Sequence, residues 1–183
     1  MCEEMIVYHA APTLAGIKTG SLFSCPFSDN NEMMKCVRYW NRELSTTGVQ
    51  AIPVKQGKCR TLVYVYRKTS LEKTLNRKDT RELLIPLGYT DFSVSSCLCR
   101  LIRKLKNNEQ FPHEIGIFLG YPVEDVRGFM EHHGKNCKCT GCWKVYGNAN
   151  QARKTFINYK RCSDDYCRRF AAGSSIKSMT ITE

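Results

Sequence analysis

The chain has 183 residues, of which 42% are hydrophobic and 25% are charged, and it carries a formal net charge of +11. This composition is typical of a globular protein rather than a disordered one, and the length predicts a single domain over residues 1–183. The longest apolar runs, such as residues 61–66, are far shorter than the roughly 20 residues of a membrane span. Because the chain starts with acidic residues and no apolar segment follows, it lacks a secretory signal, and we expect a cytoplasmic protein.

The basic charge and the cysteines limit the functions to consider. Residues 35–81 carry twelve basic and three acidic side chains, and residues 132–183 carry ten and three. Such a field attracts nucleic acid or anionic metabolites, although a solvated basic surface gives the same pattern. The chain has eleven cysteines, an odd number. Without an export signal we expect reduced thiols, some of them buried as small hydrophobic residues.

Periodicity and capping residues predict the helices and strands. We expect helices over residues 3–11, 31–44, 70–76, 80–87, 95–106, 122–133 and 149–170, and strands over residues 21–27, 49–54, 60–66, 143–146 and 176–182. Pro12 is expected to open a further helix, because proline fits a first helical turn. Asn148 is expected to cap the longest helix, and Gly173 to end it.

Two neighbouring strands indicate the fold class. Residues 49–54 and 60–66 are joined by a short connection that contains Gly57, which predicts an antiparallel hairpin. The second run has no polar face, as expected of a strand that is covered on both sides. Helices outnumber strands and do not alternate with them strictly. The sequence therefore predicts an α+β fold, with a small mixed sheet whose central hairpin packs against several helices.

Four stretches resemble a known family. They are residues 9–25 (HAAPTLAGIKTGSLFSC), 111–126 (FPHEIGIFLGYPVEDV), 141–146 (GCWKVY) and 160–181. They lie in the same order as in the clostridial family called domain of unknown function 3793, so the resemblance covers nearly the whole chain. It implies a cytoplasmic protein of anaerobic, low-GC Gram-positive bacteria (Firmicutes), and no activity. Where this chain has Cys142, similar proteins often have Tyr.

A cysteine-rich segment could hold a metal. The candidate ligands are His133, Cys137, Cys139 and Cys142. Cys139 and Cys142 form a Cys-x-x-Cys pair, which can bind zinc through two thiolates. The other pair that could complete the site, Cys162 and Cys167, points about 140° apart on a helix. A redox role would need a thiol with a lowered pKa, and reduced thiols without a role are the third alternative. We expect no four-ligand site.

Two groups of residues are candidates for catalysis. His9, Lys18 and Cys25 could provide a base, a cation and a thiolate nucleophile, or could mark a helix-to-strand junction with a buried thiol. His113 and Glu114 form an adjacent histidine–carboxylate pair, which could perform acid–base work. Neighbours on a helix point about 100° apart, however, so a tightly packed helix–turn–helix is the alternative for this segment.

Aromatic residues in the family-like stretches favour a pocket. The candidate ligand-binding residues are Tyr121, Trp143, Lys144 and Tyr146. We expect Trp143 to be largely buried, with its indole N–H paired. The positive charge and the aromatic residues together predict a protein that binds a small anionic metabolite or cofactor, or an enzyme of unknown reaction.

Two alternatives remain open at this stage. One is a metal or redox protein that uses the cysteines. The other is a nucleic-acid-binding protein that uses residues 55–81. The nucleic-acid alternative is less favoured, because the aromatic residues of the longest helix lie on its apolar stripe and its charges can pair with one another. The sequence identifies no particular cofactor.

Overall fold

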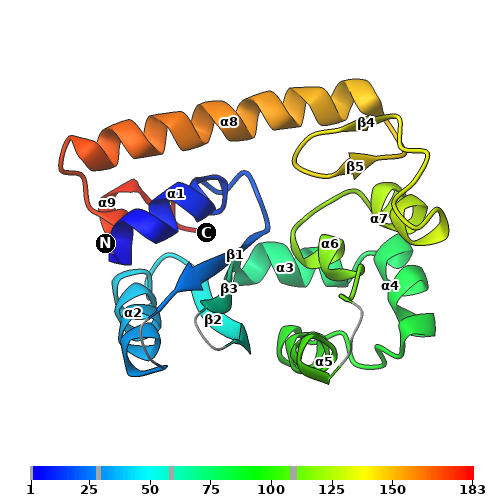
Figure 1. Ribbon diagram of the computed structural model, residues 1–183, viewed down its shortest axis with the longest axis horizontal. Coiled ribbons are helices and arrows are strands. Elements are labelled where there is room, and N and C mark those ends of the chain that lie inside the picture. The colour runs from blue at the N-terminus through cyan, green and yellow to red at the C-terminus, as the bar shows by residue number, and fades with distance from the viewer. Residues whose placement is uncertain (1, 28–29, 58–59, 108–110) are drawn as a thin grey trace. The chain divides into compact units, whose positions relative to one another are not determined.

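The computed structural model describes residues 2–27, 30–57, 60–107 and 111–183 (Figure 1). The elements are α1 (Cys2–Leu14), β1 (Gly20–Pro26), α2 (Asn30–Glu43), β2 (Val49–Gln56), β3 (Arg60–Arg67), α3 (Lys68–Leu75), α4 (Lys78–Leu84), the 3₁₀ helix η1 (Ile85–Leu87), α5 (Val94–Asn107), α6 (Ile115–Phe118), α7 (Val123–Glu131), β4 (Cys139–Thr140), β5 (Lys144–Val145), α8 (Ala149–Ala171) and α9 (Ile176–Met179). The predicted α+β class is confirmed. Contacts divide the chain into two compact units: unit 1 is Met1–Ser70 with Arg161–Glu183, and unit 2 is Leu71–Lys160.

Unit 1 is built on a three-stranded sheet with the order β1-β3-β2. The predicted hairpin is confirmed, because β2 pairs with β3 in antiparallel register from Val49, opposite Arg67, to Gln56, opposite Thr61. The register shifts between Pro53 and Lys55, at a proline that has no N–H to donate to the ladder. The β1 strand also pairs antiparallel with β3, so the sheet is antiparallel throughout rather than mixed.

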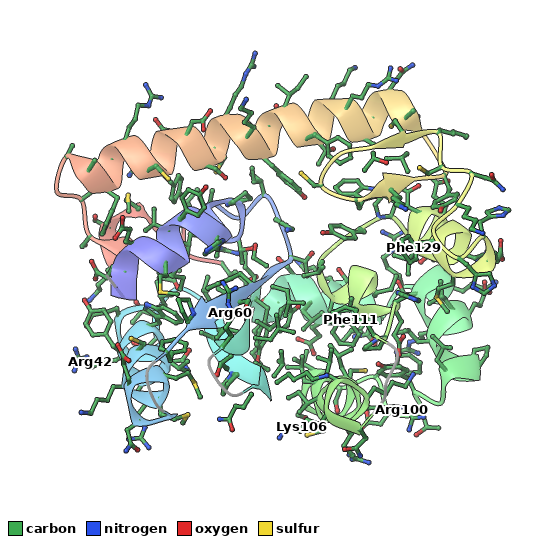
Figure 2. The ribbon with its side chains drawn as sticks, in the orientation of Figure 1. Arg42, Arg60, Arg100, Lys106, Phe111 and Phe129 are labelled. Carbon is green, nitrogen blue, oxygen red and sulfur yellow. The ribbon has the colours of Figure 1, made fainter. Side chains whose placement is uncertain are left out.

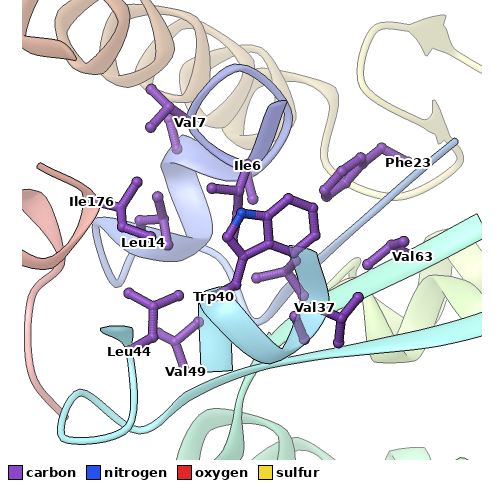
Figure 3. Close-up of a cluster of buried hydrophobic side chains, with 14 of the residues drawn as sticks. Ile6, Val7, Leu14, Phe23, Val37, Trp40, Leu44, Val49, Val63 and Ile176 are labelled. Atoms are coloured by element: carbon purple, nitrogen blue, oxygen red, sulfur yellow. The ribbon is translucent and has the colours of Figure 1, made fainter. Parts of the chain in front are cut away.

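The core of unit 1 lies on one face of this sheet. Phe23 and Val63 point into it from the strands, and α1 and α2 cover it (Figure 3). Val37, Trp40 and Leu44 follow one another at spacings of three and four residues, so one face of α2 is apolar and becomes buried. Trp40 is completely buried in this core.

A buried arginine joins distant segments of unit 1. Arg67 is 2% exposed, and its guanidinium donates to the carbonyl oxygens of Thr13 (3.0 Å), Leu14 (3.2 Å) and Ile181. Its Nε atom also lies 3.6 Å from the carboxylate of Glu183. Because buried charges need polar partners, these contacts fix the C-terminal segment against β3 and the end of α1.

Two predictions about unit 1 are wrong. Pro12 does not open a second helix but lies inside α1, two residues before its end at Leu14, and its missing N–H removes one helical hydrogen bond. Residues 176–182 do not form a strand but begin with the short helix α9, whose N-cap Ser175 accepts the N–H of Ser178 at 3.2 Å. The two buried residues of this segment, Ile176 and Met179, are three apart, and that spacing is helical.

Unit 2 is mainly helical. The helix predicted over residues 95–106 is confirmed as α5, which buries Leu98, Leu101 and Leu105 on one face. The strands β4 and β5 form a two-stranded antiparallel ribbon, with Thr140 opposite Lys144. Asn148 caps α8 as predicted, because its side chain accepts the N–H of Gln151 at 3.0 Å. In the described part of the chain, no helix combines the length and apolarity that a membrane span requires.

Candidate functional site

Unit 2 contains a cavity of about 310 Å³ with a mostly apolar lining. Its walls come from the segment before α6, from α6 and α7, and from the β4–β5 ribbon. The lining residues are Phe111, His113, Ile115, Gly116, Tyr121, Asp125, Val126, Phe129, Thr140, Gly141, Cys142, Trp143 and Lys144. Figure 2 labels two of them, Phe111 and Phe129.

Several aromatic rings belong to this lining or pack against it. Tyr121 stacks on Trp143 with 4.7 Å between the ring centroids, and Phe156 of α8 meets Trp143 edge to face at 4.5 Å. His113 lies against Phe129 at 4.9 Å. Rings that already contact one another hold their positions without a ligand, so the cavity is preformed.

Glycines allow the elements of the cavity to approach closely. A Cβ atom on Gly141 would lie 2.2 Å from the ring of Phe156, and one on Gly116 would lie 2.7 Å from Val126. Gly120 has a φ of +77°, which the turn between α6 and α7 requires. The predicted close packing in this helix–turn–helix is therefore confirmed.

Hydrogen bonds to Asp125 connect the ribbon to α7. This side chain is buried, at 3% exposure, and Oδ2 accepts the indole N–H of Trp143 at 2.7 Å. Oδ1 accepts the backbone N–H groups of Tyr146 and Gly147, each at 2.7 Å. Three N–H donors satisfy the carboxylate where water has little access. The expected pairing of the Trp143 indole is confirmed, and the ring itself is partly buried.

Lys144 is the cationic side chain of the lining. Its ammonium donates to the carbonyl oxygen of Gly134 at 2.7 Å and lies 5.9 Å from the centroid of the Phe129 ring. The Tyr121 hydroxyl donates to the carbonyl oxygen of Cys142 at 3.3 Å. Burial, with a smaller contribution from Cys142, raises the pKa of Tyr121 to about 12, so its hydroxyl stays neutral at physiological pH.

The structure brings three of the four predicted ligand-binding residues together. Tyr121, Trp143 and Lys144 all line the cavity, but Tyr146 does not. The Tyr146 hydroxyl donates to the carbonyl oxygen of Lys135 at 2.9 Å, and its ring stacks on His132 at 5.6 Å. Tyr146 therefore holds the turn before the ribbon instead of the cavity wall.

The side chains of His113 and Glu114 lie in different environments. His113 is exposed at the cavity, whereas Glu114 is buried, at 4% exposure. Glu114 forms an ion pair with Lys104 and accepts the hydroxyl of Tyr89 at 3.3 Å. Because the two side chains lie in different places, the geometry does not favour joint acid–base work.

His9, Lys18 and Cys25 lie in unit 1. The ring of His9 stacks on that of Phe23, with 4.8 Å between the centroids. Lys18 follows α1, and its backbone N–H donates to the carbonyl oxygen of Pro12 at 3.1 Å. Cys25 is completely buried in β1, and this burial raises its pKa to about 12. A thiol that stays protonated is a poor nucleophile, so the geometry favours the alternative of a junction with a buried thiol.

The cysteine-rich segment is spread along the ribbon. Cys142 is exposed and lines the cavity, while Cys137 lies near the hydroxyl of Thr140, 3.5 Å away. His133 is exposed, with a φ of +49°. Among the described residues, no three side chains of His, Cys, Asp or Glu come together as metal ligands do, Cys139 included.

The basic segment 55–81 exposes most of its described cations, among them Lys55, Lys73 and Lys78. Arg67 is buried, and Tyr64 stacks on Tyr66 at 5.1 Å with both rings buried. Arg77 pairs with Asp79 on the surface. Among the described residues of this segment, no exposed tyrosine lies between the charges, where bases could stack.

The fold and the cavity define an α+β protein with an aromatic-lined cavity in its helical unit. The chain belongs to the family described as "Protein of unknown function (DUF3793)", which it matches over residues 6–180. This match confirms the resemblance seen in the sequence and spans both compact units. No curated protein and no solved structure matches the chain.

Proposed function

We propose that the protein binds a small molecule, an anionic metabolite or cofactor, in the cavity of unit 2. The observation that carries the proposal is that four aromatic side chains and one lysine line the same cavity. They are Phe111, Tyr121, Phe129 and Trp143, with Lys144. Apolar walls with a few polar groups are the usual composition of a ligand site. A volume of about 310 Å³ is at the small end of such sites and suits a compound of one or two rings.

Two further observations support the proposal, one about the charge of the ligand and one about the compartment of the protein. The net charge of +11 raises the local concentration of anions around the protein. The nine cysteines whose side chains are described are all free thiols, which supports a reducing compartment and thus the cytoplasm.

The two tryptophans of the chain allow a direct test. Trp143 lines the cavity, and Trp40 is buried in unit 1. We expect the dye 1-anilinonaphthalene-8-sulfonate to bind with one molecule per chain, and to shift the indole N–H resonance of Trp143 and not that of Trp40. Dye fluorescence gives the affinity in parallel.

Matched phenylalanine variants locate the dye. Phe129→Ala removes a cavity wall and is expected to weaken binding about tenfold. Phe92→Ala removes a ring of unit 2 that lies outside this cavity, against Arg81, and is expected to leave the affinity within about twofold. Equal affinities of both variants, or a shift at Trp40, would contradict the proposal.

A further inference from the structure

Among the residues that the structure describes, no carboxylate forms an ion pair with Lys144. Its ammonium has three N–H donors, and the carbonyl oxygen of Gly134 accepts one of them at 2.7 Å. Among the described residues, the ion pairs of the protein do not include Lys144. Two donors therefore remain for a ligand in the cavity.

Asp125 is the one carboxylate among the described residues of the lining, and it cannot take the place of that ligand. Asp125 uses both oxygens for the three N–H groups of Trp143, Tyr146 and Gly147. These hydrogen bonds, each 2.7 Å long, satisfy the carboxylate inside the protein. Among the described residues, the lining therefore offers Lys144 no free carboxylate, and the remaining donors of Lys144 are open to a ligand.

A hydroxyl group lies beside the lysine. Thr140 and Lys144 face each other across the β4–β5 ribbon, and both line the cavity. Directly opposed residues of an antiparallel pair have Cβ atoms about 5 Å apart. A carboxylate bound to Lys144 is therefore within reach of the Thr140 hydroxyl as a second donor.

The apolar part of the ligand has its own surface. The stacked pair Tyr121 and Trp143 provides a broad aromatic wall in the same lining as Lys144, and the ring of Phe129 lies 5.9 Å from the ammonium. Planar rings bind such walls by stacking and by burying apolar area. The neutral hydroxyl of Tyr121 brings no negative charge that would repel an acid.

From this arrangement we infer that the cavity selects planar aromatic carboxylates. Lys144, assisted by Thr140, binds the acid, and Trp143 with Tyr121 binds the ring. The inference rests on the proposed function and specifies its ligand class.

A pair of compounds with the same shape tests the selection. Calorimetric titration of the full chain with 2-naphthoate and with its neutral analogue 2-naphthamide is expected to show about tenfold tighter binding of the acid. Lys144→Met is expected to reduce this ratio to within about twofold while naphthamide still binds, and Lys144→Arg to keep most of it. Lys144→Gln repeats the test if the methionine variant unfolds at a lower temperature.

Lys138 offers a matched control. Its ammonium also donates to one backbone carbonyl, that of Gly147 at 2.7 Å, but the side chain does not line the cavity. Lys138→Met should therefore keep the full preference for the acid. Equal binding of acid and amide by the wild type, or a preference that survives in Lys144→Met and Lys144→Gln, overturns the inference and leaves the cavity as a binding site. Binding of neither compound contradicts the proposed function itself.

Discussion

Trp143 donates its indole N–H to the buried carboxylate of Asp125, with 2.7 Å between Nε1 and Oδ2. The other carboxylate oxygen accepts the backbone N–H groups of Tyr146 and Gly147, which follow β5. One side chain of α7 therefore holds the residues on both sides of β5. This attachment keeps the ring of Trp143 in the cavity wall.

Asp125→Asn tests this attachment. An asparagine oxygen can still accept the two backbone N–H groups, but its NH₂ group then faces the indole N–H of Trp143. We expect a loss of about 2 kcal/mol in the free energy of unfolding, measured with urea. Glu124→Gln changes the neighbouring exposed carboxylate and is expected to cost less than about 0.5 kcal/mol.

The contribution of the Trp143 contact is separated by a double-mutant cycle. Trp143→Phe removes the indole N–H and keeps an aromatic ring. In the Asp125→Asn background this change should cost about 1 kcal/mol less than in the wild type, because the donor has already lost its acceptor. Additive effects of the two changes would show that the hydrogen bond does not stabilise the ribbon.

The ion pair between Lys104 and Glu114 predicts an asymmetric response to mutation. Lys104→Met leaves the buried Glu114 carboxylate with only the hydroxyl of Tyr89, and should cost about 3 kcal/mol in unfolding free energy. The double variant with Glu114→Gln should recover at least half of that loss, since no buried charge remains. Lys106→Met, on the exposed side of the same helix, is the control. A double variant no more stable than Lys104→Met would contradict this account.

The cysteines should differ in their rates of alkylation. Burial raises the pKa of Cys25 to about 12 and that of Cys97 to about 11, so the thiolate fraction of both is very small at pH 8. We expect iodoacetamide at pH 8 to label the exposed Cys99 and Cys142 first and to leave the two buried thiols unmodified in the folded protein. Mass spectrometry of peptides after timed labelling measures this order. Equally fast labelling of Cys25 would restore it as a candidate nucleophile.

Glu183 should stabilise the protein in a pH-dependent way. Its side chain accepts the backbone N–H groups of Thr69 (2.9 Å) and Ser70 (3.1 Å) in the first turn of α3. Burial alone would raise the pKa of this carboxyl, but these hydrogen bonds outweigh it and hold the pKa below the usual 4.5. Glu183→Gln is therefore expected to cost about 1 kcal/mol at pH 7.

The sign of the shift determines where this difference disappears. Because the folded protein lowers the pKa, the stabilisation is fully present above the ordinary pKa and is lost as the pH falls through the lowered one. Thermal unfolding midpoints of Glu183→Gln and the wild type should therefore differ at pH 7 and converge in acid. Glu43→Gln is the control, because this carboxylate of the same unit pairs with the exposed side chain of Arg42. A constant difference down to the lowest pH would count against the capping role.

The elements of unit 1 were largely predictable because local patterns agree with burial. The spacing of Val37, Trp40 and Leu44 places all three on one helix face, and that face is the one that the sheet covers. The segment 176–182 was not predictable in the same way. Its apolar residues fit both a strand and a helix, and the cap at Ser175 decides between them.

The cavity was only partly predictable. Tyr121, Trp143 and Lys144 were identified from aromatic residues and charge, but Asp125 and Phe129 were not assigned to the site. The face of α7 that meets the ribbon is set by tertiary contacts, which no single helix pattern contains. The sequence nevertheless contains a signal that relates these two residues. Phe129 follows Asp125 by four residues, so both lie on the same face of α7. Tyr146 lies outside the lining, because β5 ends at Val145 and the alternation of a strand stops there.

The division of the chain into units has a consequence for its synthesis. Unit 2 is one continuous segment, Leu71–Lys160, whereas unit 1 combines Met1–Ser70 with Arg161–Glu183. On the ribosome, the first 70 residues must therefore wait for residues 161–183 before Ile176 and Met179 can complete their core and Glu183 can reach Arg67. Unit 2 depends on no later residues, because it is one continuous segment. Residues 1–70 thus belong to a unit whose core is complete only when Ile176 and Met179 join it, although α1 and α2 already cover the sheet.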